Sequence, residues 1–152
     1  MSSLDNKLEE SVSEFFSKAG ACTTRSQCDA FASKTFGGPV KPVRLQGAYS
    51  YTVAAANDTV IVQFREPHSP LDTQMLATAQ NVHPDFVAGC SFHGTIGSSP
   101  ALLIYAMNML AGDNYFTISL SMLDEDLDHQ LATVRSLARF IKLSFTFSLQ
   151  TR

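Results

Sequence analysis

The chain has 152 residues, of which 45% are apolar and 16% are charged, enough for a single domain with a real core. Its net charge is −3 and its Lys and Arg residues are scattered, which argues against a nucleic-acid partner. No apolar run is long enough to span a bilayer, and no basic segment followed by an apolar stretch opens the chain. We therefore expect no membrane and no secretion.

The cysteines and histidines argue against a metal site. The three cysteines, Cys22, Cys28 and Cys90, are odd in number and lack the paired spacing of zinc ligands. Free thiols in a reducing compartment are the simplest interpretation, so we expect a cytoplasmic location. The four histidines also lack the close spacing of a ligand set. We expect no metal and no other cofactor.

Two helices are predicted at the N-terminus. In residues 3–18, apolar side chains recur at helical spacing opposite glutamates, which indicates an amphipathic helix. The apolar positions are Leu4, Leu8, Val12, Phe15 and Phe16. A second, short helix is expected from Ser26 to Thr35, ended by Gly37-Gly38-Pro39.

The middle of the chain has the pattern of an antiparallel sheet. VKPVRLQGAYSYTVAA, an Asn57-Asp58 turn and TVIVQF give alternating or β-branched segments joined by short turns. Ser69-Pro70-Leu71-Asp72 then resembles a helix start, and the helix LDTQMLATAQ is ended by His83-Pro84-Asp85. Two further strands, CSFHGTI and ALLIYAM, flank a GSSP turn.

A long last helix is expected after an acidic segment, LDEDLDH, which suits a helix N-terminus. Its apolar positions are Leu127, Leu131, Val134, Leu137, Ile141 and Phe145. The pattern as a whole predicts an α+β fold with an antiparallel sheet of about five strands, N-terminal helices and a long C-terminal helix. We expect one domain over 1–152, divided into helices (1–36), sheet and helix (37–112), and linker with final helix (113–152).

The stretch TVIVQFREPHSPLD contains the main candidate site. Its strand places Gln63 and Arg65 on one face and continues into Glu66, His68 and Asp72, in a loop restricted by two prolines. A histidine beside two carboxylates is suited to acid–base chemistry. The alternative is structural: Arg65 pairs with Glu66 or Asp72, Asp72 caps its helix, and His68 is solvated.

Aromatic residues give a second set of candidates. Tyr49 and Tyr51 fall on the same face of a predicted strand and could line a pocket with rings and hydroxyl groups. Packing in the core or at its rim is the alternative for both. His93, in the middle of a strand, is expected to be a hydrogen-bonded structural histidine.

Several segments, taken in order, resemble a known family. VRLQGAYSYTV, VIVQFR, a helix, HPDFVAG, GTIGSSPALLIYAMNMLAG and ATVRSLARFIKLSF are similar to the N-terminal lobe of fungal phosphotransferases of the aminoglycoside phosphotransferase and choline kinase type. The resemblance spans roughly residues 36–147, and LLIYAM followed by NMLAG is its most specific part. It implies the smaller lobe of a kinase-like fold.

The same resemblance implies that phosphate transfer is lost. In the family the catalytic Asp follows the last of these helices, and this chain ends at Arg152, about where that loop should begin. Gln63 or Arg65 stands where the third strand should carry a Lys, and the helix LDTQMLATAQ has no Glu to pair with it. We therefore expect no kinase activity.

Two functions remain, with a truncated, inactive gene product as a third possibility. The first is a non-phosphorylating protein that binds an apolar small molecule and guides its cyclisation or isomerisation, a natural role in fungal specialised metabolism. Arg65 would bind an anion or carbonyl, Glu66 or His68 would act as acid or base, and the pocket would take polar groups from Gln63, Tyr49, Tyr51 and Asp72. The second is a pseudokinase-type module that binds a protein partner. In either case the apolar last helix needs cover, and we expect a homodimer through it.

Overall fold

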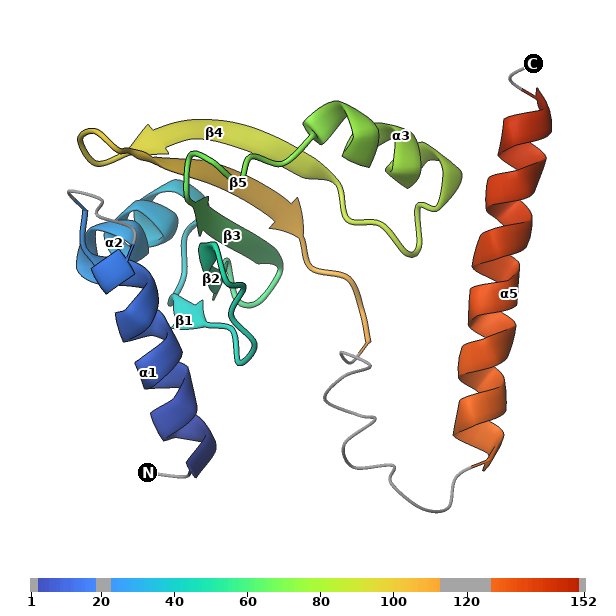
Figure 1. The fold of residues 1–152 in the computed structure, drawn as a ribbon, viewed down its shortest axis with the longest axis horizontal. Helices are drawn as coiled ribbons and strands as arrows, with labels where there is room; N and C mark the ends of the chain where they lie inside the picture. The colour runs from blue at the N-terminus through green and yellow to red at the C-terminus, as the bar shows by residue number, and fades with distance from the viewer. Residues whose placement is uncertain (1–2, 19–22, 113–126, 151–152) are drawn as a thin grey trace. The chain divides into compact units, whose positions relative to one another are not determined.

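The computed structural model describes residues 3–18, 23–112 and 127–150, apart from the side chains of 3–4, 127, 129 and 143–150. The described residues form four helices and five strands, in the order that the sequence predicts (Figure 1). They are α1 (Ser3–Lys18), α2 (Arg25–Phe36), β1 (Lys41–Pro42), β2 (Ser50–Ala55), β3 (Val60–Arg65), α3 (Thr73–Val82), β4 (Cys90–Ile96), β5 (Leu102–Asn108) and α5 (Leu127–Gln150). The predicted α+β fold is confirmed.

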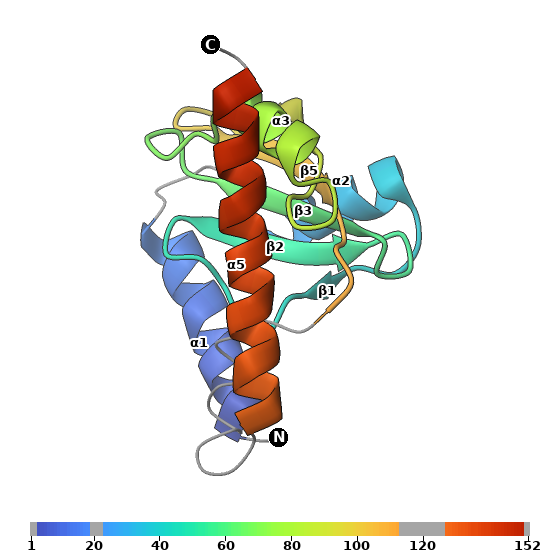
Figure 2. The same cartoon turned by 90° about the vertical axis from the view of Figure 1, so that its right-hand side faces the viewer.

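The five strands form one antiparallel sheet in the order β1-β2-β3-β5-β4. Figure 2 shows β1, β2, β3 and β5 stacked in this sequence. In the register of the ladder, Gln63 lies between Thr52 on β2 and Tyr105 on β5. The β2–β3 turn runs through Asn57 and Asp58 with φ of 55° and 65°, a left-handed conformation that these two residue types tolerate.

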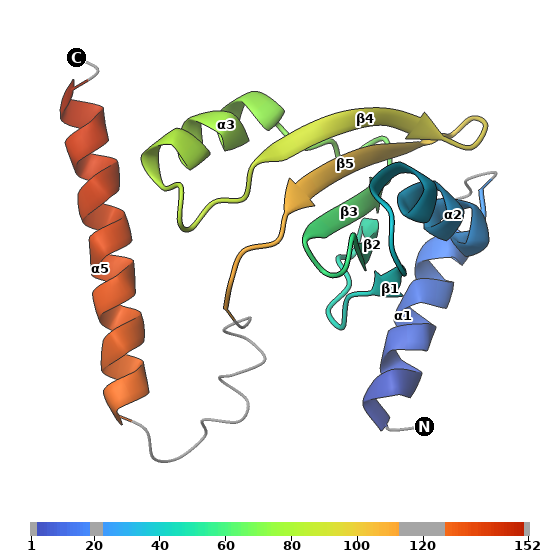
Figure 3. The same cartoon turned by 180° about the vertical axis from the view of Figure 1, so that it is seen from behind.

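Helices α1 and α2 cover one face of the sheet (Figures 1 and 3). Val12 and Phe15 of α1 are buried there, as the helical spacing predicts. On β3, Val62 and Phe64 face this core, and Gln63 and Arg65 lie on the opposite face of the strand. The predicted alternation is confirmed. The core cluster is Val12, Phe15, Cys28, Ala32, Tyr51, Val53, Ala55, Val62, Phe64, Leu102 and Ile104.

The two strands expected within VKPVRLQGAYSYTVAA are present as β1 and β2, with a turn between them. β1 stops at Pro42 and β2 begins only at Ser50, so Tyr49 lies outside the strand in which it was predicted. Between the two strands, the Gln46 side chain makes hydrogen bonds to the backbone. Its amide nitrogen donates to the carbonyl oxygens of Val43 and Thr52, and its amide oxygen accepts from the Thr52 N–H. Side-chain hydrogen bonds of this kind compete with the ladder.

Both edges of the sheet are irregular. β1 has two residues, and the register between β4 and β5 shifts between Phe92 and Thr95. Gly94 lies in this shift with a φ of 86°, a conformation that glycine adopts without a steric penalty.

The chain divides into two compact units, Met1–Ala77 with Ala88–Met109, and Thr78–Val87 with Leu110–Arg152. The sheet, α1 and α2 belong to the first unit. In the second, the Phe140 ring of α5 stacks on His83, which follows the end of α3. None of the helices in the described ranges is both long enough and apolar enough to cross a membrane. The single domain expected over 1–152 stays a prediction.

Candidate functional site

Arg65 closes the loop that follows β3. Its Nε donates to the Ser69 carbonyl oxygen at 2.8 Å and its Nη2 to the Ser69 Oγ at 2.8 Å, while its Nη1 donates to the Gln63 Oε1 at 3.1 Å. The Ser69 N–H in turn donates to the Glu66 carbonyl oxygen. These bonds fix the path of residues 65–69, and they use three of the five guanidinium N–H groups. The predicted partners of Arg65, Glu66 or Asp72, are replaced by Gln63 and Ser69.

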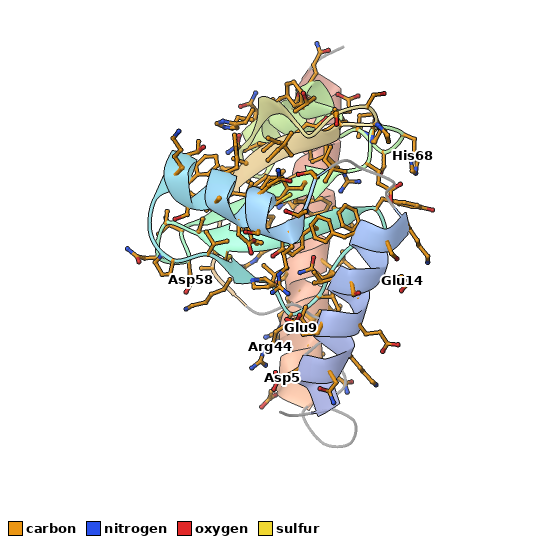
Figure 4. All side chains as sticks on the ribbon, turned by 90° about the vertical axis from the view of Figure 1, so that its left-hand side faces the viewer. Asp5, Glu9, Glu14, Arg44, Asp58 and His68 are labelled. Carbon is orange, nitrogen blue, oxygen red and sulfur yellow. The ribbon has the colours of Figure 1, made fainter. Side chains whose placement is uncertain are left out.

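Glu66 and His68 lie side by side in this loop. The Glu66 Oε2 is 3.2 Å from the His68 Nδ1, and the Glu66 side chain is only 13% exposed whereas that of His68 is 63% exposed. A carboxylate at Nδ1 orients the ring and favours a proton on that nitrogen, which leaves Nε2 to exchange protons with another molecule. Figure 4 shows His68 projecting from the loop at the periphery of the structure.

Tyr49 completes this group. It lies in the turn before β2, and its carbonyl oxygen accepts a hydrogen bond from the Glu66 N–H at 3.0 Å. The Tyr49 ring meets the His68 ring edge to face, with 5.3 Å between centroids. The structure therefore brings Tyr49, Glu66 and His68 together, and we call these three residues the loop triad.

A small cavity of about 150 Å³ is lined in part by Glu66 of this triad. It is lined by Ser11, Glu14, Phe15 and Lys18 of α1 and by Gly47, Ala48 and Glu66. Glu14 and Lys18 are already paired with each other. Pockets for drug-sized ligands measure roughly 300–1,000 Å³, so this cavity suits one end of a ligand rather than the whole.

Tyr51 lies apart from the triad. It is fully buried in the core, stacked on Phe64, and its hydroxyl donates to the Asp29 Oδ1 at 2.8 Å and accepts from the Arg25 Nε at 3.3 Å. Burial, reinforced by the bond to Asp29, raises the pKa of Tyr51, so the phenol stays neutral. Tyr49 is not in the strand, and the two tyrosines do not share a face as the alternation suggests.

Asp72 also has a structural partner. Its Oδ1 accepts a hydrogen bond from the Met75 N–H at 2.8 Å, so it caps α3, as the structural alternative predicts. The helix begins at Thr73, two residues later than expected. His93 has the expected hydrogen bond, at 2.9 Å to the Ser91 Oγ, and its ring meets that of Phe36.

Sequence reasoning missed a polar group on the face of the sheet that α1 and α2 cover. Arg25 binds Glu9 of α1 at 2.7 Å, and this bond is the main reason that its pKa is raised. Together with Asp29 and Tyr51 it joins two helices to the sheet. The four-residue spacing of Arg25 and Asp29 on one helix was the available signal, but their common partner on β2 is not encoded locally.

A larger cavity, about 480 Å³, lies beside this polar group, and it contains none of the predicted site residues. Its lining is Glu9, Val12, Ser13, Phe16, Thr23, Thr24 and Arg25. Within the described part of the chain, no three His, Cys, Asp or Glu side chains are grouped as metal ligands. The loop triad is therefore the best candidate for chemistry.

The chain matches no protein-family model, no curated protein and no solved structure. The resemblance to kinase-type phosphotransferases thus rests on the quoted segments and on the order of helices and strands, and the loop triad is interpreted from its own geometry.

Proposed function

We propose that the protein binds an apolar small molecule at the loop triad and catalyses a proton transfer on it, such as an isomerisation or cyclisation. The observation that carries this proposal is the nearly buried Glu66 carboxylate, 3.2 Å from Nδ1 of a His68 that is itself exposed. In such a pair the carboxylate accepts a hydrogen bond from Nδ1–H and orients the ring, and Nε2 takes a proton from the substrate to give the imidazolium. The same imidazolium then returns the proton to another atom of the substrate, so no oxidant or reductant is needed.

Both apolar and polar groups surround the triad, which suits an apolar ligand with one polar end. The Tyr49 ring is exposed beside His68, and Phe15 lines the small cavity next to Glu66. The polar end of the ligand would enter the cavity, whose lining includes Glu14 and Lys18, while its apolar part lies over Tyr49. Arg65 holds the loop rather than a substrate, because three of its donors are engaged within the chain.

Phosphate transfer has no comparable support. The helix α3, TQMLATAQNV, carries no acidic residue that could pair with a phosphate-binding cation. The free thiols of Cys28 and Cys90 fit a reducing, cytoplasmic location. Calorimetric titration with ATP and magnesium is expected to give no heat, and tight metal-dependent binding would contradict this part of the proposal.

Deuterium exchange tests the proton transfer without knowledge of the natural substrate. The protein is incubated in D₂O with a panel of apolar cyclic ketones, and incorporation of deuterium next to the carbonyl is followed by mass spectrometry. We expect exchange on at least one ketone, lowered roughly 100-fold or more in His68→Gln and lowered also in Glu66→Gln. His93→Gln, another exposed histidine with a hydrogen-bond partner, is the matched control. Equal exchange in His68→Gln and the wild type would refute the role of the triad.

A second candidate function is partner binding through α5. Four large apolar side chains of this helix, Leu131, Val134, Leu137 and Ile141, are between 41% and 62% exposed. Apolar residues grouped in this way mark interaction surfaces. The partner can be a second copy, as the expected homodimer requires, or a different protein.

A further inference from the structure

One side of α5 is occupied within its own unit. The Phe140 ring stacks on His83 with 3.9 Å between ring centroids, and it meets Phe86 edge to face at 6.3 Å. This contact joins α5 to the segment that follows α3. The side of α5 that carries Phe140 therefore faces this segment.

The apolar face of α5 consists of Leu131, Val134, Leu137 and Ile141. These residues are three or four positions apart and so lie along one stripe of the helix. All four are exposed, with Val134 the most at 62%. A stripe of this length matches the groove-filling face of a helix that binds another helix.

Cations border this stripe. Arg135 and Arg139 are exposed and one turn apart, on one side of the stripe. In the sequence of α5, Asp128 is the only acidic residue, and it lies near the N-terminal end of the helix, away from both arginines. The helix thus combines an apolar face with positively charged side chains along one side of that face.

We propose that the partner of α5 is an amphipathic helix of another protein whose apolar stripe is bordered by Asp or Glu. This inference rests on the second candidate function above and specifies its partner. A second copy of α5 would bring the cations of Arg135 and Arg139 toward like charges, which is costly at an interface. An anionic bilayer fits less well, because the chain is −3 overall although α5 is positive, so the remainder would be repelled.

Synthetic helical peptides test the charge and the stripe separately. The first, labelled with a fluorophore, carries a leucine stripe bordered by Glu; the second has Lys in place of Glu; the third keeps Glu but has Ser in place of leucine. Fluorescence anisotropy with the full chain is expected to give binding of the first peptide at least ~10-fold tighter than of either other peptide.

Variants of α5 provide the decisive comparison. Arg135→Glu/Arg139→Glu should invert the preference toward the Lys peptide, while Lys34→Glu/Arg44→Glu, with the same change in net charge outside α5, should leave it unchanged. Val134→Ser/Leu137→Ser should weaken the first peptide roughly tenfold, with helix content checked by circular dichroism. An unchanged preference in the charge-reversed variant would overturn the proposal, as would equal binding of the Ser peptide, which indicates attraction by charge alone.

Two further measurements separate the other occupants. A dimer in light scattering that Val134→Ser/Leu137→Ser dissociates would identify a second copy, overturning the acidic partner while keeping partner binding through α5. Co-sedimentation with phosphatidylcholine–phosphatidylserine vesicles that requires the same two residues would assign the face to a membrane and overturn both. Binding to none of these probes would also overturn both.

Discussion

At the scale of single residues, Cys28 shows how burial changes an ionisable group. Its side chain is fully buried among the core residues of α2 and the sheet. Burial raises the pKa of the Cys28 thiol to about 12, although a hydrogen bond with Thr23 acts in the opposite direction. The folded protein therefore holds this thiol in its neutral form under conditions in which the unfolded chain ionises it.

This difference predicts a loss of stability in alkali. The stabilisation is fully present below the unfolded pKa of about 8.5 and is lost as pH rises toward the folded value of about 12. Between these limits the free energy of unfolding should fall by about 1.4 kcal/mol per pH unit through Cys28. Urea denaturation at increasing pH is expected to show the wild type losing its advantage over Cys28→Ala.

The contribution of Tyr51, whose pKa is also raised, is common to both proteins and cancels in this comparison. Cys90→Ala is the control, because Cys90 is only partly buried and Arg65 opposes the rise of its pKa. A constant gap between wild type and Cys28→Ala from neutral pH to pH ~11 would contradict the assignment.

At the scale of elements, the start of α3 depends on one side chain. The Asp72 Oδ1 accepts from the Met75 N–H, a backbone group that has no partner within the helix. Asp72→Ala should lower the free energy of unfolding by about 1 kcal/mol, whereas Asp72→Asn should retain most of it because asparagine caps nearly as well. Urea denaturation checks both variants.

The same pair tests the predicted substrate contact of Asp72. If the residue serves only as a cap, deuterium exchange on ketones should be equal in Asp72→Asn and the wild type. A stable Asp72→Asn protein with reduced exchange would show that the carboxylate also takes part in binding.

Periodicity predicted most elements because a helix or strand buried on one face repeats its apolar residues at a fixed interval. This holds for α1, where Val12 and Phe15 are buried, and for β3, where Val62 and Phe64 are. It did not predict that Tyr49 lies in the turn before β2, where Gln46 is bonded to Thr52 through its side chain. Periodicity also predicted the apolar stripe of α5. It did not predict that the stripe is exposed, because the same sequence pattern occurs whether or not another element covers the helix.

The candidate site follows the same division between local and distant contacts. Glu66 and His68 are two residues apart, so their pairing could be predicted from one loop. Tyr49 reaches them through the β2–β3 pairing and Tyr51 joins Asp29 across the core, which requires the fold. Contacts between distant segments depend on packing that a single pattern does not specify.

At the scale of the whole molecule, the core cluster of the described residues lies in the first unit, between the sheet and helices α1 and α2. Phe64 is at its centre, fully buried and in contact with the rings of Phe31 and Tyr51. Phe64→Ala should lower the free energy of unfolding by about 3–5 kcal/mol, because it removes buried surface and leaves a cavity.

Phe92→Ala is the matched control on the same sheet. Phe92 is on the edge strand β4 and is 53% exposed, with its ring against that of Tyr105, so its removal should cost less than about 1 kcal/mol. Both values follow from urea unfolding monitored by circular dichroism. An equal decrease in the free energy of unfolding for Phe64→Ala and Phe92→Ala would contradict the assignment of Phe64 to the core.

The irregular edges of the sheet have a consequence for self-assembly. A neighbouring molecule can extend a sheet only where a long, flat outer strand offers unpaired amide and carbonyl groups. Here one border is two residues long and the other is kinked at Gly94, so neither is a good template for cross-β stacking. We expect the chain to resist growth into fibrils even at high concentration, and to meet other proteins through its helices.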